Sequence, residues 1–332
     1  MQAEYASPPG GAVARDSALP GRIIPDAAAP FRERFNLSSF TFSHSLAGHP
    51  LFEIPRLAEL AKTMWGKGGG NVTCHTGETP FDQGWDNVRP KALSIVDAVA
   101  RIRDSGSWVL LKSVQEVPEY GALMERCLDE LTELTGVALR EEITWVDVYI
   151  FIGSPRSVTP YHMDPESTFL FQIHGEKDYH LFDPADRTIL TEQEIERYYA
   201  GDLSAAKYKG EKQSQAQVHH LRPGVGLHQP VRAPHWVKYG DDFSVTLSIL
   251  FLMRQYTRQA KIYQVNHFLR QLGRQPTPPG RSALRDSLKV LALSSPGHRP
   301  KTKSDLLRHG LSRLDMAKKL AGRLTRGHVP AQ

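Results

Sequence analysis

The spacing of hydrophobic positions divides this 332-residue chain into strand-like and helical parts. Between residues 143 and 253, short apolar runs are separated by Gly, Pro and Asp, and several alternate with polar residues as half-buried strands do. The runs are ITWVDVYIFIG, STFLFQI, DYHLFD, HHLRPGVGLHQPV and FSVTLSILF. The pattern predicts an antiparallel β-domain, a sandwich or barrel, with one helical excursion at TEQEIERYYAGDLSAAKY.

On both sides of the predicted β-domain, apolar residues follow helical spacing. Upstream, RLAELAKTMW, LSIVDAVARIRDSG and the stretch from Pro118 to Leu134 predict helices, and WVLLKSV predicts one strand. We therefore expect residues 31–142 to form a helical buttress, preceded by an Ala-, Pro- and Gly-rich segment, 1–30, that is disordered. Downstream, residues 254–332 predict further helices at QVNHFLRQLG, SALRDSLKVLAL and DLLRHGLSRLDMAKKLAGRL. The last carries an apolar stripe at Leu307, Leu311, Leu314, Ala317 and Leu324.

Charge changes sign where the predicted β-domain ends. The formal net charge is only +5, but residues 254–332 contain 17 Lys/Arg and 3 Asp/Glu, whereas residues 1–253 contain 24 and 33. We expect the basic helices to dock onto the acidic body or to form a homodimer through the C-terminal helices. Nucleic acid, an acidic partner and a membrane surface are the alternatives, and the acidic body argues against nucleic acid as the primary ligand.

Composition narrows the class of protein. A chain that is 40% hydrophobic and 23% charged is typical of a globular protein and excludes collagen, wholly disordered chains and disulfide-dense scaffolds. The only cysteines, Cys74 and Cys127, lie far apart, which favours a reducing compartment. No run approaches the roughly 18 apolar residues of a spanning helix, and the start of the sequence does not resemble a signal peptide. We therefore expect no transmembrane segment and a cytoplasmic location.

Candidate chemistry lies between residues 157 and 184. His162 and Asp164 are separated by one residue, so on an extended strand both side chains project from the same face. His235 follows at the start of another predicted strand, far enough along the chain to return across a barrel. Two histidines and one carboxylate form the facial triad of non-haem Fe(II) sites, which leaves coordination positions open.

These segments carry a family resemblance, strongest over residues 143–253. In TPYHMD, FLFQIHGEKDYHLFDP, LRPGVGLHQP and APHWVKYGDDFSVTLS the chain resembles the JmjC/cupin-like group of Fe(II)- and 2-oxoglutarate-dependent oxygenases, and more narrowly bacterial cupin-like proteins of jumonji type. Val225 departs from that pattern, which usually has Asp there. The resemblance implies a mainly β fold with flanking helices and a double-stranded β-helix (jelly-roll) core.

The resemblance also implies residue roles. His162, Asp164 and His235 match iron ligands, and Lys177 matches the lysine that binds the distal carboxylate of 2-oxoglutarate, a task that suits a point charge. Thr159 matches a hydroxyl that hydrogen-bonds the same carboxylate, and Thr168 matches a polar position that faces the cosubstrate. No catalytic residue beyond the metal centre is implied.

The function implied is an Fe(II)- and 2-oxoglutarate-dependent dioxygenase, most simply a hydroxylase. Its substrate would be a protein or peptide side chain or a small metabolite. One alternative is a non-catalytic jumonji-type regulatory or binding module, whose basic C-terminal region contacts nucleic acid or an acidic partner. Another is a metal-dependent cupin that does not use 2-oxoglutarate. The complete triad with Lys177 favours the oxygenase, and no helix-turn-helix or zinc module indicates base readout.

Overall fold

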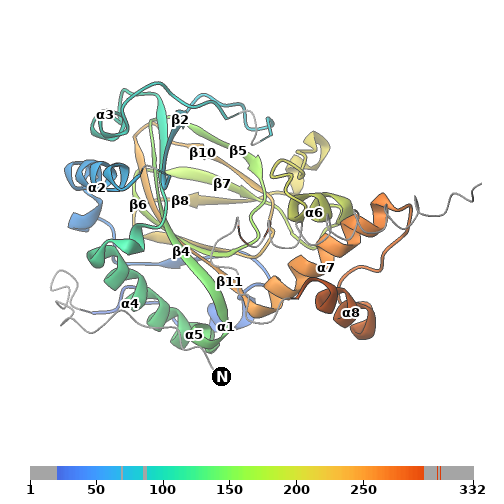
Figure 1. Cartoon of the computed structure of the whole chain (residues 1–332). Coiled ribbons are helices and arrows are strands. Elements are labelled where there is room, and N and C mark those ends of the chain that lie inside the picture. Colours follow the sequence, from blue (N-terminus) through green and yellow to red (C-terminus); the bar gives the residue numbers. More distant parts are fainter. Residues whose placement is uncertain (1–20, 69, 85–87, 295–304, 306, 308–332) are drawn as a thin grey trace, which may run out of the picture.

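Two antiparallel β-sheets form the body of the protein (Figure 1). The structure is a computed structural model that describes residues 21–68, 70–84, 88–294, 305 and 307. The seven-stranded sheet has the order β1-β9-β6-β11-β4-β3-β2, and the four-stranded sheet has the order β5-β10-β7-β8. The large sheet contains β1 (Phe40–Ser43), β2 (Val72–Thr76), β3 (Ser107–Leu111), β4 (Ile143–Gly153), β6 (Ser167–His174), β9 (Val225–Gln229) and β11 (Ser244–Met253). The small sheet contains β5 (Val158–His162), β7 (Lys177–Leu181), β8 (Gln217–Leu221) and β10 (His235–Tyr239).

Strands β4 to β11 form a double-stranded β-helix. Four of them, in the order β9-β6-β11-β4, face the other four, in the order β5-β10-β7-β8. Successive strands cross between the two sheets, except that β7 and β8 are neighbours in the small sheet. The longest pairing joins β11 to β4, from Ser244 opposite Gly153 to Met253 opposite Ile143. The predicted fold, mainly β with flanking helices around a jelly-roll core, is confirmed.

Alternating side chains of β4 face two different environments, a cavity and the hydrophobic core. Trp145, Asp147, Tyr149 and Phe151 line a cavity, whereas Val148, Ile150 and Ile152, which alternate with them, are buried in the main hydrophobic core. Because successive side chains of a strand point to opposite faces, one strand both seals the core and forms a cavity wall.

Helices flank the barrel on two sides (Figure 1). On one side lie α1 (Ala29–Arg34), α2 (Ile54–Gly66), α3 (Ile95–Ala100), α4 (Pro118–Thr135) and α5 (Leu139–Glu142); on the other lie α6 (Glu192–Tyr199), α7 (Arg254–Gln271) and α8 (Ala283–Leu293). Short 3₁₀ turns occur at η1 (Pro50–Phe52), η3 (Val114–Glu116) and η4 (Gly210–Gln215). The predicted helices at RLAELAKTMW and from Pro118 are confirmed, whereas α3 is shorter than LSIVDAVARIRDSG predicts.

The expected helical buttress is wrong in part, because residues 31–142 also contribute three strands to the large sheet. β3 was predicted and pairs with β4. β2 extends the sheet beyond β3, and β1 pairs with β9 at the opposite edge. Neither FTFS nor VTCHT stands out as an apolar run in the sequence, and both strands are stabilised by pairing with other strands of the sheet.

The expected disorder of residues 1–30 is wrong for residues 21–30, and residues 1–20 lie outside the described residues. Ile23 and Ile24 are completely buried. Their backbone N–H groups donate hydrogen bonds of 2.9 and 2.7 Å to the two carboxylate oxygens of Glu130 on α4. Two buried isoleucines offset the entropy cost of ordering a short segment, and a Pro- and Ala-rich composition does not reveal that contact.

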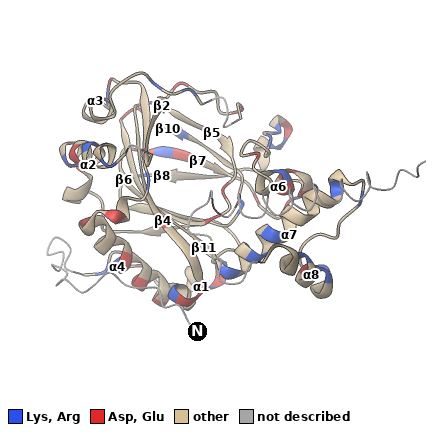
Figure 2. Ribbon diagram, viewed as in Figure 1, with Lys and Arg blue, Asp and Glu red and all other residues tan. Residues whose placement is uncertain are grey.

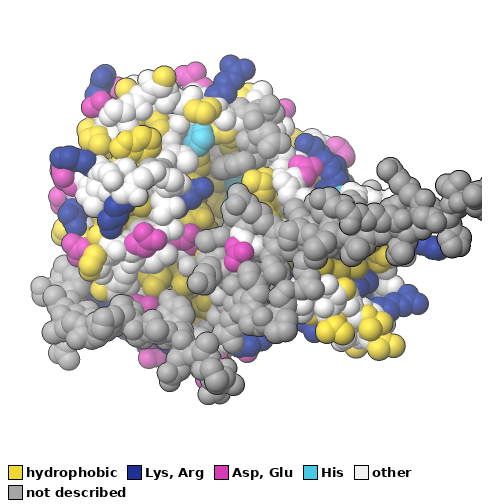
Figure 3. Space-filling view, viewed as in Figure 1, with side chains coloured by type: hydrophobic (Ala, Val, Ile, Leu, Met, Phe, Trp, Pro, Cys, Tyr) yellow, Lys and Arg dark blue, Asp and Glu magenta, His cyan; other side chains and the backbone are white. Residues whose placement is uncertain are grey.

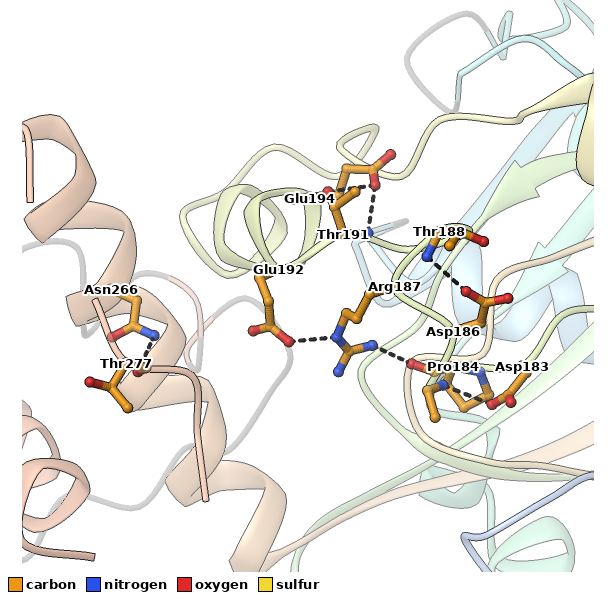
Figure 4. A network of polar contacts seen from close by, with 11 residues as sticks. Asp183, Pro184, Asp186, Arg187, Thr188, Thr191, Glu192, Glu194, Asn266 and Thr277 are labelled. Atoms are coloured by element: carbon orange, nitrogen blue, oxygen red, sulfur yellow. Dashed lines mark hydrogen bonds and ion pairs between the residues drawn. The ribbon is translucent and has the colours of Figure 1, made fainter. Parts of the chain in front are cut away.

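The helical excursion between β7 and β8 is confirmed as α6, which begins with a capping box (Figure 4). The Thr191 hydroxyl accepts a hydrogen bond from the backbone N–H of Glu194, whose carboxylate accepts from the backbone N–H of Thr191. Just before the helix, the Arg187 guanidinium donates to Glu192 and to the Pro184 carbonyl. These contacts fix the loop that leads from the small sheet into α6.

The basic region continues directly from the barrel. α7 begins at Arg254, immediately after β11, and α8 follows it; both were predicted, and Lys and Arg are prominent on them (Figure 2). On α8, Leu284, Leu288 and Leu291 are exposed, and hydrophobic side chains are visible there in Figure 3. Of the predicted third helix only Asp305 and Leu307 are described, so the rest of its apolar stripe lies outside the described residues.

Two further expectations concern compartment and membrane. Cys74 and Cys127 are both buried and form no disulfide. Within the described ranges, no helix has the length and apolar content that crossing a membrane requires.

Candidate metal centre

His162, Asp164 and His235 come together inside the barrel, as predicted from their spacing. Each offers a ligand atom, and the three atoms lie within 4.8 Å of one another. Nε2 of His162 is 3.3 Å and Nε2 of His235 is 4.0 Å from the same carboxylate oxygen, Oδ2 of Asp164. Among the residues that the structure describes, this is the only group of three or more His, Cys, Asp or Glu side chains arranged to hold a metal ion.

Backbone carbonyl groups fix the orientation of both imidazoles. Nδ1 of His162 lies 2.7 Å from the carbonyl oxygen of Pro160, and Nδ1 of His235 lies 3.0 Å from that of Ala233. Because a carbonyl oxygen only accepts, each Nδ1 carries the proton, and in the neutral ring Nε2 then presents a lone pair. Two imidazole lone pairs and one carboxylate oxygen therefore converge, an arrangement that a divalent cation resolves. The donor set fits Fe(II).

Strand register brings the histidines together. His162 is the last residue of β5 and His235 is the first of β10, and the two residues are paired opposite each other in the small sheet. Asp164 lies just beyond the end of β5, not on the extended strand that the sequence suggested. A backbone hydrogen bond of 2.9 Å from the N–H of Arg232 to the carbonyl of Asp164 ties its segment to the loop before β10.

Arg232 is itself unusual. Its φ of 64° lies in the left-handed region, which costs free energy for a residue with a side chain. The guanidinium carbon lies 5.7 Å from the ring centroid of Tyr256 and 5.6 Å from that of Tyr263, both on α7. One residue thus contacts both the segment that contains Asp164 and the helix that follows the barrel.

A cavity of about 420 Å³ contains the triad and is lined by residues of both sheets. Thr159 on β5, Thr168 on β6 and Lys177 on β7, the three residues predicted to bind the cosubstrate, all line it. Thr168 is paired with Gln229 of β9, which also lines the cavity. The hydroxyl of Thr159 lies 3.5 Å from that of Tyr239, which accepts a 2.9 Å hydrogen bond from the indole N–H of Trp108.

Lys177 is a buried lysine on the wall of this cavity. The side chain is 3% exposed, and burial lowers the pKa of its ammonium to about 7. Nζ donates a 2.7 Å hydrogen bond to the hydroxyl of Thr246, and no carboxylate of the described residues forms an ion pair with it. A desolvated ammonium with neutral neighbours is unfavourable when charged, and an anionic ligand would compensate for that cost.

A chain of neutral hydrogen bonds supports Lys177. The Thr246 hydroxyl donates to Oε1 of Gln172 at 2.8 Å, so it accepts from the ammonium. Nε2 of Gln172 in turn donates to the Ser244 hydroxyl and to the His174 carbonyl, both at 2.8 Å. Sequence reasoning missed Thr246 and Gln172. The available signal was the spacing of two between Ser244, Thr246 and Ser248 in an otherwise apolar strand.

Three further polar or aromatic side chains of the β-domain have structural partners away from the triad. His228 is fully buried and accepts a 3.0 Å hydrogen bond from the backbone of Asn36. Trp236 stacks between His180 and Phe81, with ring centroids 3.7 and 4.4 Å away. The exposed Arg156 pairs with Asp241 at 3.6 Å. None of these three residues lines the cavity.

Comparison with known proteins shows that the chain matches one protein family. The model of a family described as a cupin-like domain matches residues 76–256, more than half of the chain. No curated protein matches the chain.

Similar solved structures include an X-ray structure of ycfD from Escherichia coli, with 15% identity and a TM-score of 0.49, covering 90% of this chain and 68% of that one. They also include YcfD, a ribosomal oxygenase from Escherichia coli, in complex with cobalt and 2-oxoglutarate, with 14% identity and a TM-score of 0.45, covering 91% of this chain and 67% of that one. The DMSP lyase DddQ from Ruegeria pomeroyi DSS-3 is more distant, with 15% identity and a TM-score of 0.22, covering 32% of this chain and 38% of that one. The family match, and not these distant structures, identifies what the chain is related to.

Proposed function

This chain belongs to the cupin-like domain family, and from that premise we propose that it is an Fe(II)- and 2-oxoglutarate-dependent oxygenase. The observation that carries the proposal is the presence of the triad and the buried ammonium of Lys177 in one cavity. A metal-dependent cupin that does not use a carboxylate cosubstrate has no need for a buried lysine without an ion-pair partner in the cavity of its metal.

His162, Asp164 and His235 would hold Fe(II) on one face, with the carbonyls of Pro160 and Ala233 keeping Nε2 of each imidazole directed at the metal. The bound iron supplies a centre at which dioxygen is reduced as 2-oxoglutarate is decarboxylated and a substrate C–H bond is oxidised.

Lys177 would bind the distal carboxylate of 2-oxoglutarate, a role supported by its burial and its neutral surroundings. Thr246 holds the ammonium from one side, and Thr159 offers a hydroxyl on the cavity wall. Thr168 lines the same cavity on β6, where its side chain can face the cosubstrate. The low-dielectric setting strengthens the contact between ammonium and carboxylate.

The simplest reaction is hydroxylation of a protein or peptide side chain or of a small metabolite. The remaining lining of the cavity, on β3, β4 and β11, would contact that substrate. The aromatic and aliphatic side chains of these walls would exclude bulk water from the metal, and the polar ones would hold the reacting group beside it.

Anaerobic titration tests the proposal directly. The full chain with Fe(II) and 2-oxoglutarate should develop the weak visible charge-transfer band of the chelate and, in air, form succinate. His162→Ala and Lys177→Ala should lose the band at moderate 2-oxoglutarate concentrations. His220→Ala and Lys238→Ala are matched controls, because both side chains are exposed. Absence of both band and succinate in the wild type would rule out the oxygenase, and a band retained by His162→Ala would rule out the assigned ligands.

A further inference from the structure

We propose that Gln229 binds the metal-chelating end of 2-oxoglutarate, donating a hydrogen bond from its side-chain amide to an oxygen of the 2-oxo acid group. The proposal rests on the proposed oxygenase function and deepens it, because it assigns a role to a buried polar side chain that neither the triad nor the contacts of Lys177 account for. Gln229 is the last residue of β9 and lines the cavity that contains the triad.

Only one end of the Gln229 amide has a hydrogen-bond partner. The residue is 1% exposed, and its Oε1 accepts a hydrogen bond from the phenol of Tyr179. Nε2 is buried as well and has no hydrogen-bond partner within the described residues. A buried amide N–H without an acceptor is unfavourable, and such groups are rare in folded proteins. An acceptor oxygen that enters the cavity would remove this cost.

Tyr179 fixes the direction of the amide. Because its hydroxyl donates to Oε1 of Gln229, both N–H bonds of Nε2 are left for another acceptor. The ring of Tyr179 also stacks on the imidazole of His235, with the centroids 5.0 Å apart and the planes inclined by 17°. One side chain therefore contacts both a candidate metal ligand and Gln229, which places the amide on the metal side of the cavity.

Strand register separates Gln229 from Lys177. Gln229 is paired with Thr168 on β6, and Thr168 in turn is paired with Leu250 on β11. Thr246, which accepts the hydrogen bond of Lys177, precedes Leu250 by four residues on β11, which corresponds to roughly 13 Å along a strand. An anion whose distal carboxylate is bound by Lys177 would therefore present its other end toward Gln229 and Thr168.

Thr168 is held beside Gln229 by a buried histidine between the two strands. Nδ1 of His228 lies 3.2 Å from the carbonyl oxygen of Thr168, and Nε2 of the same ring accepts a hydrogen bond from the backbone N–H of Asn36. Because residues paired opposite each other project from the same face of a sheet, the Thr168 hydroxyl and the Gln229 amide are neighbours in the cavity wall.

A neutral donor is suited to the chelating end of this ligand. A 2-oxo acid binds a metal through its oxo oxygen and one carboxylate oxygen, so the second carboxylate oxygen requires a donor from the protein. A lysine or arginine in that position would repel the divalent cation, whereas an amide adds no charge. A hydrogen bond from the amide to a carboxylate is nevertheless charge-assisted and roughly twice as strong as one between neutral groups.

The experiment measures binding to the full chain loaded with Co(II), so it does not depend on turnover. The probes are 2-oxoglutarate and 2-oxovalerate, which has the same chain length and the same chelating end but no distal carboxylate. Each is titrated against the visible absorption of the bound metal. We expect Gln229→Met to weaken both probes at least about tenfold, since the lost hydrogen bond has an anionic acceptor. Lys177→Met should weaken 2-oxoglutarate strongly and leave 2-oxovalerate unchanged or tighter.

Tyr179 is a positioning residue for the amide, and a double variant tests this role. Tyr179→Phe keeps the ring beside His235 and removes only the hydroxyl, so it should weaken 2-oxovalerate in the wild type but not further in Gln229→Met. The double variant removes both partners of one buried hydrogen bond, which is nearly neutral for folding. It should therefore unfold at the temperature of the wild type, bind Co(II) equally well and retain the full loss of 2-oxovalerate affinity.

Gln213→Met is the matched control. Its amide contacts His180 and Trp236 and does not line the cavity, so this variant should bind both probes as the wild type does. Binding of 2-oxovalerate unchanged by Gln229→Met, in the wild type and in Lys177→Met alike, would overturn the proposal. A loss confined to 2-oxoglutarate would also overturn it, because the amide would then act at the distal carboxylate. If the Co(II) protein bound neither probe, the proposed oxygenase function would fail and this proposal with it.

Discussion

His162 and His235 face each other across the antiparallel pair β5 and β10, and the centroids of their rings lie 4.1 Å apart. The register between two short strands therefore sets the spacing of two candidate metal ligands. A slip of one residue in that register would turn one imidazole to the other face of the sheet. The hydrogen bonds of the small sheet therefore determine how accurately the two imidazoles are placed.

Removal of the Asp164 carboxylate should separate stability from metal binding. In the metal-free protein this carboxylate lies beside two imidazole lone pairs, so we expect Asp164→Ala to leave the melting temperature equal to that of the wild type or raise it by a few degrees. Co(II) at about 100 times its dissociation constant should stabilise the wild type by about 2.7 kcal/mol and the variant hardly at all. Thermal unfolding with and without Co(II) measures both effects, and equal stabilisation of the two proteins would contradict the assignment.

Binding of 2-oxoglutarate should take up a proton above neutral pH. Burial lowers the pKa of the Lys177 ammonium to about 7 in the empty cavity, whereas a bound carboxylate favours the charged form and raises it. Between these two pKa values the complex holds a proton that the free protein lacks, so affinity should fall as pH rises, by at most about tenfold per unit. Calorimetry at pH 8 in buffers of different ionisation enthalpy reports the uptake, which should vanish in Lys177→Met together with most of the affinity.

Gly175 should be required for the turn that positions Lys177. Its φ is 69°, and a Cβ there would overlap the carbonyl oxygen of Phe243. We expect Gly175→Ala to lower the free energy of unfolding by about 3 kcal/mol or more, since steric overlap adds to the cost of a left-handed alanine. Gly273→Ala is the matched control: its φ is 72° but nothing lies within 4 Å of the added Cβ, so about 1 kcal/mol is expected. Urea unfolding of the two variants would contradict this account if their losses were equal.

Stability should decline in mild acid because of buried histidines. Burial lowers the pKa of His44 and His219 to about 4 and that of His228 to about 3. An unfolded histidine binds its proton near pH 6.5 while these three stay neutral in the fold, so the unfolded state gains protons first as pH falls. Each contributes a loss of at most about 1.4 kcal/mol per pH unit below 6.5. Urea unfolding at pH 7.5, 6 and 5 measures the slope, and His228→Gln should make it shallower.

The fold and the triad were predictable because their signals are local. His162 and Asp164 lie within one short motif, and the strands from β4 to β11 show themselves through alternation and turn residues. β1 and β2 were not predicted, because neither FTFS nor VTCHT stands out from its surroundings as an apolar run, and each is a strand through its pairing with β9 or β3. The order of residues 21–30 likewise depends on Glu130, more than a hundred residues away.

The cosubstrate end of the site could be predicted only in part. Lys177 stands in a motif that resembles a known family, whereas Thr246 and Gln172 contribute through pairing between β6 and β11. Asp147 is the only acid in the apolar run ITWVDVYIFIG. That its side chain lines the cavity depends on which face of β4 points inward. That face is decided by the helices that cover the other side, so the sequence of the strand alone does not reveal it.

Arg232 makes the end of the last strand, at Met253, a poor place to divide this protein. Its backbone N–H donates a hydrogen bond to the carbonyl of Asp164, and its guanidinium lies against the rings of Tyr256 and Tyr263 on α7. A fragment that stops at the last strand would retain every candidate metal ligand and lose both tyrosines, exposing an arginine held in a strained conformation to solvent. We expect such a fragment to bind metal weakly, so the smallest autonomous folding unit of this chain extends through α7.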